Sequence, residues 1–236
     1  MTDSFLQALR LLGNADSALL QIIALSLRVS ASACVLGALM GLALGAWLAT
    51  ARWPGLGLLV GLLNTLLALP SVVVGLVVYL LLSRAGPLGS WGILFTPTAM
   101  VIAQSILVVP LIAALSRRLL LDTLAEGGEQ LRSLGASPLQ CAALLLVHER
   151  WAVLTILLAA FGRAIAEVGA VMMVGGNIAG VTRVMTTAIA LQTSQGDLPL
   201  ALALGAVLLG VVGLLNLLLG LLGRWAARQR PLLVGA

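Results

Sequence analysis

The sequence predicts an all-α integral membrane protein, a polytopic bundle of about five transmembrane helices, or six if the N-terminal residues add a span. Of its 236 residues, 61% are hydrophobic and 9% are charged, and the mean hydropathy is +1.15. Soluble domains are roughly half apolar and about a quarter charged. A transmembrane helix needs about 20 apolar residues. The chain length therefore fits one membrane domain with little room for a soluble one.

Five long apolar segments supply the expected spans, at residues 19–50, 55–82, 96–120, 141–175 and 198–223. The first is longer than one crossing, so we expect its span at 26–49 and an interfacial amphipathic helix before it. Arg28 then lies near the outer end of that span, where it either snorkels to the interface or lends positive potential to an anion path. Pro70 and Pro110 predict kinks in the second and third segments.

The arginines orient these segments. If the five segments alternate across the membrane, one side receives Arg52, Arg117, Arg118, Arg132, Arg150, Arg224, Arg228 and Arg230, and the other receives Arg10, Arg84 and Arg183. Cytoplasmic loops carry the excess of Lys and Arg. The sequence therefore predicts a cytoplasmic C-terminus and an outside N-terminus, which a sixth span would move inside.

Several function classes are excluded by residue content. All thirteen basic residues are arginine, so a Walker A loop with its lysine is absent and ATP is not hydrolysed by that route. The arginines are scattered, unlike the basic patch of a nucleic-acid-binding protein. His148, Cys34 and Cys141 have no spacing typical of a metal site or a catalytic triad. We therefore predict no catalytic residue, no metal, no cofactor and no enzymatic activity.

Residues 122–140 are too polar to span the membrane and form an organised cytoplasmic segment. An apolar stripe repeats at three- and four-residue steps, formed by Leu121, Leu124, Leu131 and Leu134, and the opposite face carries Glu126, Glu129, Gln130, Arg132 and Ser133. Gly135 predicts a left-handed helix end, and Ser137 with Pro138 predicts the start of another helix. This helix, turn and helix is either a rigid docking element for another protein or an ordinary interfacial helix.

Two charges fall inside the fourth apolar segment, Arg163 and Glu167. Charges in a span are unfavourable and usually face a partner or a water-filled cavity. Four residues apart on a helix, the two side chains lie on one face and can pair. They are either a structural ion pair or part of a translocation path or gate.

The segment EQLRSLGASPLQCAALLLVHER at residues 129–150 resembles the cytoplasmic EAA loop of permease subunits in binding-protein-dependent ABC importers. Glu129 and Gly135 keep the family's spacing of acidic residue and glycine, whereas Gln130 and Leu131 replace its two alanines and His148 stands where proline is usual. The resemblance implies that the segment docks on an ATPase subunit. Its coupling residues would be Glu129, Leu134, Gly135, Ala136 and Ser137.

A second stretch, FGRAIAEVGAVMMVGGN at residues 161–177, is similar to the sulfate-, molybdate- and tungstate-type permeases, and its continuation to Asp197 is most similar to the tungstate type. The resemblance implies a single permease domain over residues 1–236, with a core at 24–224 that includes the coupling loop 122–140. It also implies a homodimer in a bacterial cytoplasmic (inner) membrane, bound by two copies of an ATP-binding subunit. An extracytoplasmic oxyanion-binding protein would deliver the anion, and the loop 177–199 either receives that protein or is a plain solvated loop.

The expected function is movement of a tetrahedral oxyanion, tungstate before molybdate or sulfate, by ATPase-driven alternating access. A dianion cannot shed its water in hydrocarbon without replacement contacts, so the path should offer hydroxyls, backbone donors or arginine. The alternatives are an ABC permease for another small solute and a secondary transporter that works without an ATPase.

Overall fold

The computed structural model describes residues 17–229, with side chains to residue 223. Its first helix, α2, runs from Ser17 to Thr50 without interruption. No separate interfacial helix therefore precedes the span among these residues, because residues 17–26 contain no proline or glycine that would end a helix. The part of the expected interfacial helix before residue 17 lies outside the described residues.

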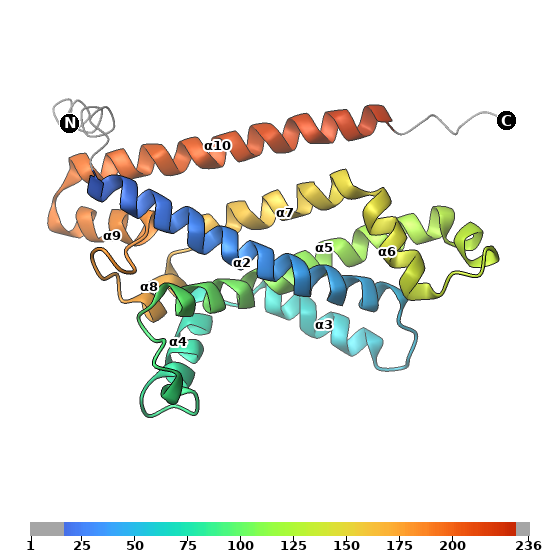
Figure 1. The fold of residues 1–236 in the computed structure, drawn as a ribbon, viewed down its shortest axis with the longest axis horizontal. Helices are drawn as coiled ribbons and strands as arrows, with labels where there is room; N and C mark the ends of the chain where they lie inside the picture. Colours follow the sequence, from blue (N-terminus) through green and yellow to red (C-terminus); the bar gives the residue numbers. More distant parts are fainter. Residues whose placement is uncertain (1–16, 230–236) are drawn as a thin grey trace.

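The long helices lie side by side along one axis (Figure 1). Three run in the same direction, α2, α5 (Pro97–Ser133) and α10 (Leu198–Gln229), while α3 (Leu56–Leu67) and α7 (Arg150–Ile165) run back. The shorter elements are α4 (Ser71–Leu82), η1 (Gly89–Trp91), α6 (Pro138–His148), α8 (Gly169–Gly175) and α9 (Met185–Gln195). Among the described residues every element is therefore helical, as the sequence predicts.

A row of glycines brings α2 and α5 into close contact. Gly37, Gly41 and Gly45 recur every four residues on one face of α2, and all three are buried. A Cβ added at Gly37 would lie 2.7 Å from Val108 Cγ1, and one added at Gly41 would lie 2.8 Å from Ile112 Cβ. Small residues allow membrane helices to approach this closely. The parallel pair α2 and α5 forms the centre of the subunit.

Two of the five expected spans are broken. In the described residues, only α2, α5 and α10 are long and apolar enough to cross a membrane alone. The pair α3 and α4 is bent by 99°, and the pair α6 and α7 by 79°. A 12-residue helix such as α3 is about 18 Å long, shorter than the roughly 30 Å hydrocarbon core. Residues 55–82 and 141–175 are therefore not straight helices, and there are five crossings only if each bent pair is one span.

The two interior prolines behave differently. Pro70 is the residue before α4 and has an extended backbone, with φ −63° and ψ 124°, so the chain changes direction there. Pro110 lies within α5 without ending it. Each proline removes one backbone hydrogen bond. At Pro70 the helix has already ended, because the turn at Ala68 closes α3 two residues earlier.

Large apolar side chains cover the outside of the bundle. Leu39, Leu58 and Leu209 are 68%, 85% and 73% exposed, and they lie on α2, α3 and α10. Soluble monomers seldom expose large continuous apolar patches. These surfaces therefore require lipid or another apolar surface, which agrees with a multi-pass membrane protein.

Candidate functional site

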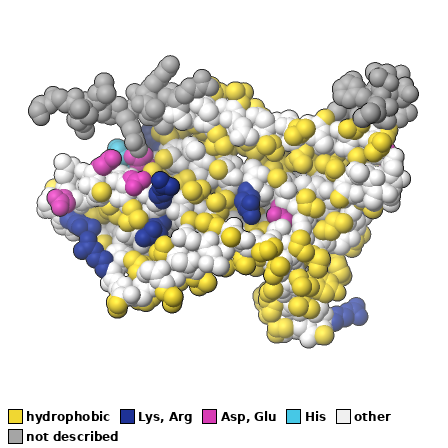
Figure 2. Space-filling view, turned by 180° about the vertical axis from the view of Figure 1, so that it is seen from behind, with side chains coloured by type: hydrophobic (Ala, Val, Ile, Leu, Met, Phe, Trp, Pro, Cys, Tyr) yellow, Lys and Arg dark blue, Asp and Glu magenta, His cyan; other side chains and the backbone are white. Residues whose placement is uncertain are grey.

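Charged side chains gather at one end of the molecule (Figure 2). This is the end where α2 and the parallel helix α5 both finish. Here Arg117 Nε donates a 3.4 Å hydrogen bond to the carbonyl oxygen of Leu48. Trp47 and Trp53 are also exposed nearby, and tryptophan and arginine are enriched at membrane interfaces. We place one membrane boundary at this level.

Helix α5 continues beyond that boundary. Its 37 residues make a helix of about 55 Å, whereas about 20 residues cross the hydrocarbon core. Residues 119–133 therefore project past Arg118 by about 22 Å. The sequence predicted a separate short helix over this segment, and that prediction is wrong, because no residue between Leu119 and Ser133 interrupts the helical hydrogen bonds.

The turn after α5 has the predicted local structure. Gly135 has a φ of +86°, a left-handed conformation that glycine adopts without steric penalty. The N–H of Ala136 donates to the carbonyl of Leu131 at 3.2 Å, which closes the end of the helix. Ser137 then caps α6 in a reciprocal pair with Gln140. These bonds hold the turn in one conformation.

Helix α6 attaches this turn to the transmembrane core. Cys141, Ala142 and Leu145 are buried, and two of them pack in a cluster with Ala46 of α2 and Leu120 of α5. The turn is therefore joined through α6 to the two central helices. Interiors are close-packed and transmit strain rather than absorbing it.

The surface of the turn is partly apolar and partly charged. Leu134 is 83% exposed, and Glu129, Gly135 and Ser137 are exposed as well, while Ala136 is half-buried. The predicted polar face is confirmed, since Glu126, Glu129, Gln130, Arg132 and Ser133 are all exposed. The predicted apolar stripe holds only for Leu124 and Leu131, which pack on the cluster around α6. Burial of the exposed leucine at the tip in an apolar groove of another protein would be favourable by about 1.5–3 kcal/mol.

The fourth predicted segment is interrupted between α7 and α8, at residues 166–168. Helix α7 ends at Ile165, and α8 begins at Gly169, so Arg163 and Glu167 do not share a helical face as expected. Arg163 is exposed. Glu167 Oε1 accepts a 3.1 Å hydrogen bond from the N–H of Ala170. Within residues 17–229 no ion pair joins the two side chains. The predicted geometry of the pair is therefore wrong.

Tertiary contacts hold this helix break. The Thr186 hydroxyl donates to the carbonyl of Glu167 at 2.8 Å, which satisfies one of the groups freed by the break. Gln104 of α5 is 4% exposed and donates from Nε2 to the carbonyl of Ala164 at 2.9 Å. Its Oε1 is buried without a partner. Sequence reasoning missed Gln104, although it is an amide within a long apolar segment.

The expected outer loop at residues 177–199 is largely structured. Helix α9 occupies residues 185–195, and Met185, Thr187 and Ala188 are buried. The Met185 N–H donates to the Ser26 hydroxyl of α2 at 2.8 Å. The picture of a plain solvated loop is therefore wrong for residues 182–189, which are buried or half-buried, whereas residues 178–181 and 193–198 are exposed.

No group of three His, Cys, Asp or Glu side chains suited to a metal ion occurs among the described residues. Two features are well defined by geometry. One is the turn at the charged end, residues 134–137, which is called the docking turn below, and the other is the helix break at residues 166–168. Multiple apolar crossings, a projecting turn joined to them and a polar break within the bundle are features expected of a membrane transport subunit.

Comparison with known proteins assigns the family. No family model matches the chain. It is 43% identical over 217 residues to the tungstate uptake system permease protein TupB of Peptoclostridium acidaminophilum, covering 92% of this chain and 95% of that protein. It is 37% identical to TupB of Campylobacter jejuni, covering 91% and 90% of the two chains. A probable anion ABC transporter permease of Haloferax volcanii is 39% identical, covering 82% and 86%.

These similarities span the bundle, the docking turn and the helix break. The chain therefore belongs to the ABC transporter permeases, in the family that includes the tungstate uptake permeases. More distant similarity extends to sulfate transport permeases, including CysW of Escherichia coli, at 34% identity over 71% of this chain and 60% of that protein.

Proposed function

We propose that this chain is the transmembrane permease subunit of a binding-protein-dependent ABC importer that moves a tetrahedral oxyanion, tungstate first, across a bacterial cytoplasmic membrane. The observation that supports this most is similarity to two tungstate uptake permeases over 92% and 91% of the chain. The arrangement of the described helices agrees with it.

The proposed driving step begins at the turn formed by residues 134–137. Two copies of an ATP-binding subunit, each docked on one turn of a permease homodimer, would close around ATP and move the turns together. Leu134 supplies the exposed apolar tip, Gly135 the left-handed bend and Ser137 the cap of α6. Glu129 precedes Gly135 on the last turns of α5 and would offer a negative charge to the groove of the ATP-binding subunit. Ala136 completes the turn.

Motion of the turn would reach the membrane core through α6. Its buried side packs on α2 and α5, so these helices would tilt with it. The translocation path would then open alternately to the outside and to the cytoplasm. This account places the C-terminus, the turn and the Arg52 connection in the cytoplasm, as the distribution of arginine predicts. An extracytoplasmic oxyanion-binding protein would meet the opposite end.

The path of the anion would pass the helix break between α7 and α8. Broken helices are tolerated within a membrane where the freed backbone groups line a cavity or are buried in protein. Exposed Arg163 is proposed to contact the anion, because a dianion needs positive or hydrogen-bonding groups to replace its water. Glu167 caps α8 and is proposed to set the shape of a gate there rather than to bind the anion.

Uptake by proteoliposomes tests this function. The vesicles would hold the permease with its ATP-binding subunit, and loaded binding protein would be supplied outside. We expect ATP-dependent accumulation of tungstate, with molybdate and sulfate as weaker competitors. Preferred uptake of molybdate or sulfate would favour the alternative suggested by the sulfate permeases. Accumulation without any ATP-binding subunit would instead indicate a secondary transporter.

A further inference from the structure

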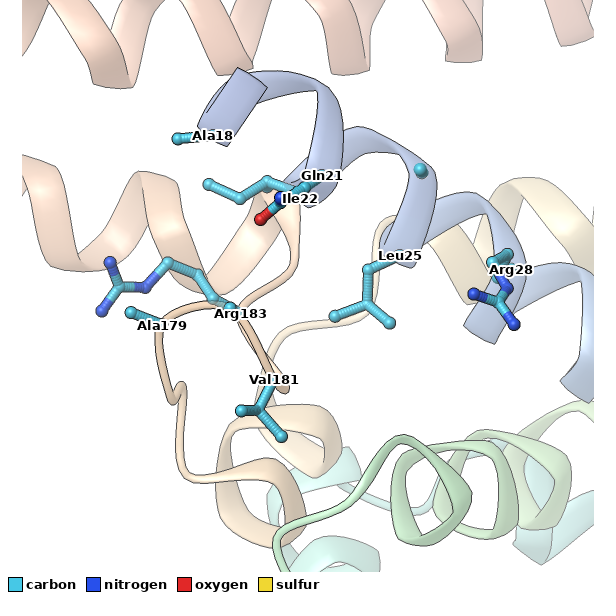
Figure 3. Close-up of a pocket in the computed structure, with 10 residues that line it drawn as sticks. Ala18, Gln21, Ile22, Leu25, Arg28, Ala179, Val181 and Arg183 are labelled. Atoms are coloured by element: carbon cyan, nitrogen blue, oxygen red, sulfur yellow. The ribbon is translucent and has the colours of Figure 1, made fainter. Parts of the chain in front are cut away.

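A half-open cleft of about 370 Å³ lies at the end of the molecule opposite the docking turn. One wall is a face of α2, with Ala18, Leu25 and Arg28 at helical spacing. The other wall is the loop after α8, which includes Arg183. Figure 3 shows the two arginines at opposite ends of the cleft, with Leu25 and Val181 between them.

The position of Arg28 along α2 places this cleft outside the hydrocarbon. Residues 28–47 of α2 span about 28 Å, close to the roughly 30 Å thickness of the core. If Trp47 lies at the cytoplasmic interface, Arg28 lies at the outer one and residues 17–27 project beyond it. The cleft therefore opens to water on the side where the binding protein delivers its anion.

Hydrogen bonds fix the two walls relative to each other. The Ser26 hydroxyl of α2 accepts from the Met185 N–H at 2.8 Å, directly after the cleft loop. Within that loop the Thr182 hydroxyl accepts from the Ile178 N–H at 2.9 Å and donates to the Gly175 carbonyl at 2.6 Å. A binding surface that is ordered before its ligand arrives loses less conformational freedom on binding.

The cleft is positively charged. Its charged lining residues are Arg28 and Arg183, and no aspartate or glutamate lines it among the described residues. Arg183 Nη2 donates to the Asn177 carbonyl at 3.4 Å, while its Nε is buried without a partner. Arg28 also lines an adjoining cleft of about 320 Å³ against the start of α5. Clefts lined by charges of one sign concentrate counter-ions.

We propose that this cleft is an entry site that holds the hydrated oxyanion dianion between Arg28 and Arg183 before it enters the path. The inference rests on the proposed oxyanion transport. Because the two arginines lie at opposite ends of the cleft, they would attract a dianion with its water shell rather than enclose a bare one. Weak binding suits a transit site, since the ion must also leave it.

Uptake measurements test the role of the charges. In the complete transporter, the double variant R28Q/R183Q is expected to lower tungstate uptake about tenfold, because the cleft would no longer concentrate anions. The charge-keeping variant R28K/R183K should retain most of the uptake. Arg84 is exposed and lies outside the cleft, so R84Q is the matched control and should transport normally. Normal uptake by the double variant would overturn the proposal.

A second measurement separates anion binding from protein docking. The affinity of loaded binding protein for the permease would be measured with the same variants. The proposal predicts unchanged affinity in R28Q/R183Q. A loss of affinity that equals the loss of uptake would mean that the arginines bind acidic groups of the binding protein, and the anion site would be rejected.

A thiol probe reports occupancy of the cleft directly. Val181 is 46% exposed in the loop wall, so V181C, in a chain whose Cys34 and Cys141 are replaced by serine, should react with a water-soluble maleimide. Tungstate, but not chloride at equal ionic strength, should slow the reaction several-fold, and R28Q/R183Q should abolish this protection. Ser90 is exposed outside the cleft, so S90C should react at one rate throughout.

The outcomes distinguish the two proposals. Labelling of V181C that tungstate does not slow would reject the entry site, even if the transporter moves tungstate normally. A wild-type transporter that moves no tungstate, molybdate or sulfate would instead contradict the proposed function on which the entry site depends.

Discussion

The docking turn at residues 134–137 and the break at residues 166–168 both interrupt helices, but they are stabilised differently. At the docking turn, a positive φ at Gly135 and the Ser137 cap of α6 involve neighbouring residues only. At the break, Gln104 and Thr186 bind backbone carbonyls from distant parts of the chain. The turn is thus a local structure exposed to a partner, whereas the break depends on the packed bundle.

The largest expected effect comes from the turn. The variant G135D introduces a charge beside the exposed tip, at a φ of +86° that aspartate and asparagine tolerate better than most L-residues. We expect loss of uptake and of ATPase stimulation in proteoliposomes, with the bundle still folded.

The matched control at this position is G135N, because asparagine tolerates left-handed backbone better than most residues and carries no charge. It should keep most of the coupling. Unchanged uptake and ATPase stimulation in G135D would refute the docking role of the turn.

A smaller effect is expected at the tip itself. Leu134 is 83% exposed, so L134A should leave the thermal stability of the permease unchanged. If Leu134 inserts in a groove of the ATP-binding subunit, the affinity of the L134A permease for that subunit should fall about tenfold. This corresponds to about 1–2 kcal/mol for a contact at the centre of an interface. Leu209 is similarly exposed on α10, and L209A is the control that should bind the ATPase normally.

The break gives a comparison of two substitutions at one residue. E167Q keeps a side-chain oxygen that can accept from the Ala170 N–H, whereas E167A removes the cap, at a cost of about 0.5–2 kcal/mol. We therefore expect E167A to lower uptake and thermal stability more than E167Q does. Equal losses in the two variants would show that the negative charge, rather than the cap, is required.

The smallest effect on uptake is expected in the helix pair that joins the two regions, where a substitution acts mainly on stability. In G41A the added methyl would lie 2.8 Å from Ile112 Cβ, and overpacking typically costs about 1–3 kcal/mol. We expect a lower denaturation temperature and a modest decrease in uptake. Gly61 has no neighbour within 4 Å of an added Cβ, so G61A should be as stable as the wild type.

The same contrast explains what could be predicted from sequence. The helical class, the direction of the long helices and the Gly135–Pro138 signals depend on composition and on adjacent residues, and the structure agrees with them. The end of α7 at Ile165 carries no proline or glycine at the break itself. It depends on Gln104, which is 60 residues away in the chain, and no local pattern reveals that contact.

The cleft at the outer end illustrates the same limit. The sequence places Arg28 near the outer end of the first span, where it either snorkels or lends positive potential to an anion path, and it places Arg183 separately in an outer loop. They line one cleft only because Met185 is hydrogen-bonded to Ser26, which precedes it by 159 positions in the sequence. Patterns among neighbouring residues do not reveal contacts between residues that are far apart in the sequence. Sites formed by such contacts are therefore found only from the folded structure.

The most direct test of the central claim is ATP-dependent tungstate uptake by proteoliposomes that contain the permease and its ATP-binding subunit, supplied with loaded binding protein. The account predicts accumulation that requires ATP, is competed by molybdate and sulfate, and disappears in G135D. Uptake that is independent of ATP, or the absence of oxyanion uptake from a folded complex that hydrolyses ATP, would contradict it.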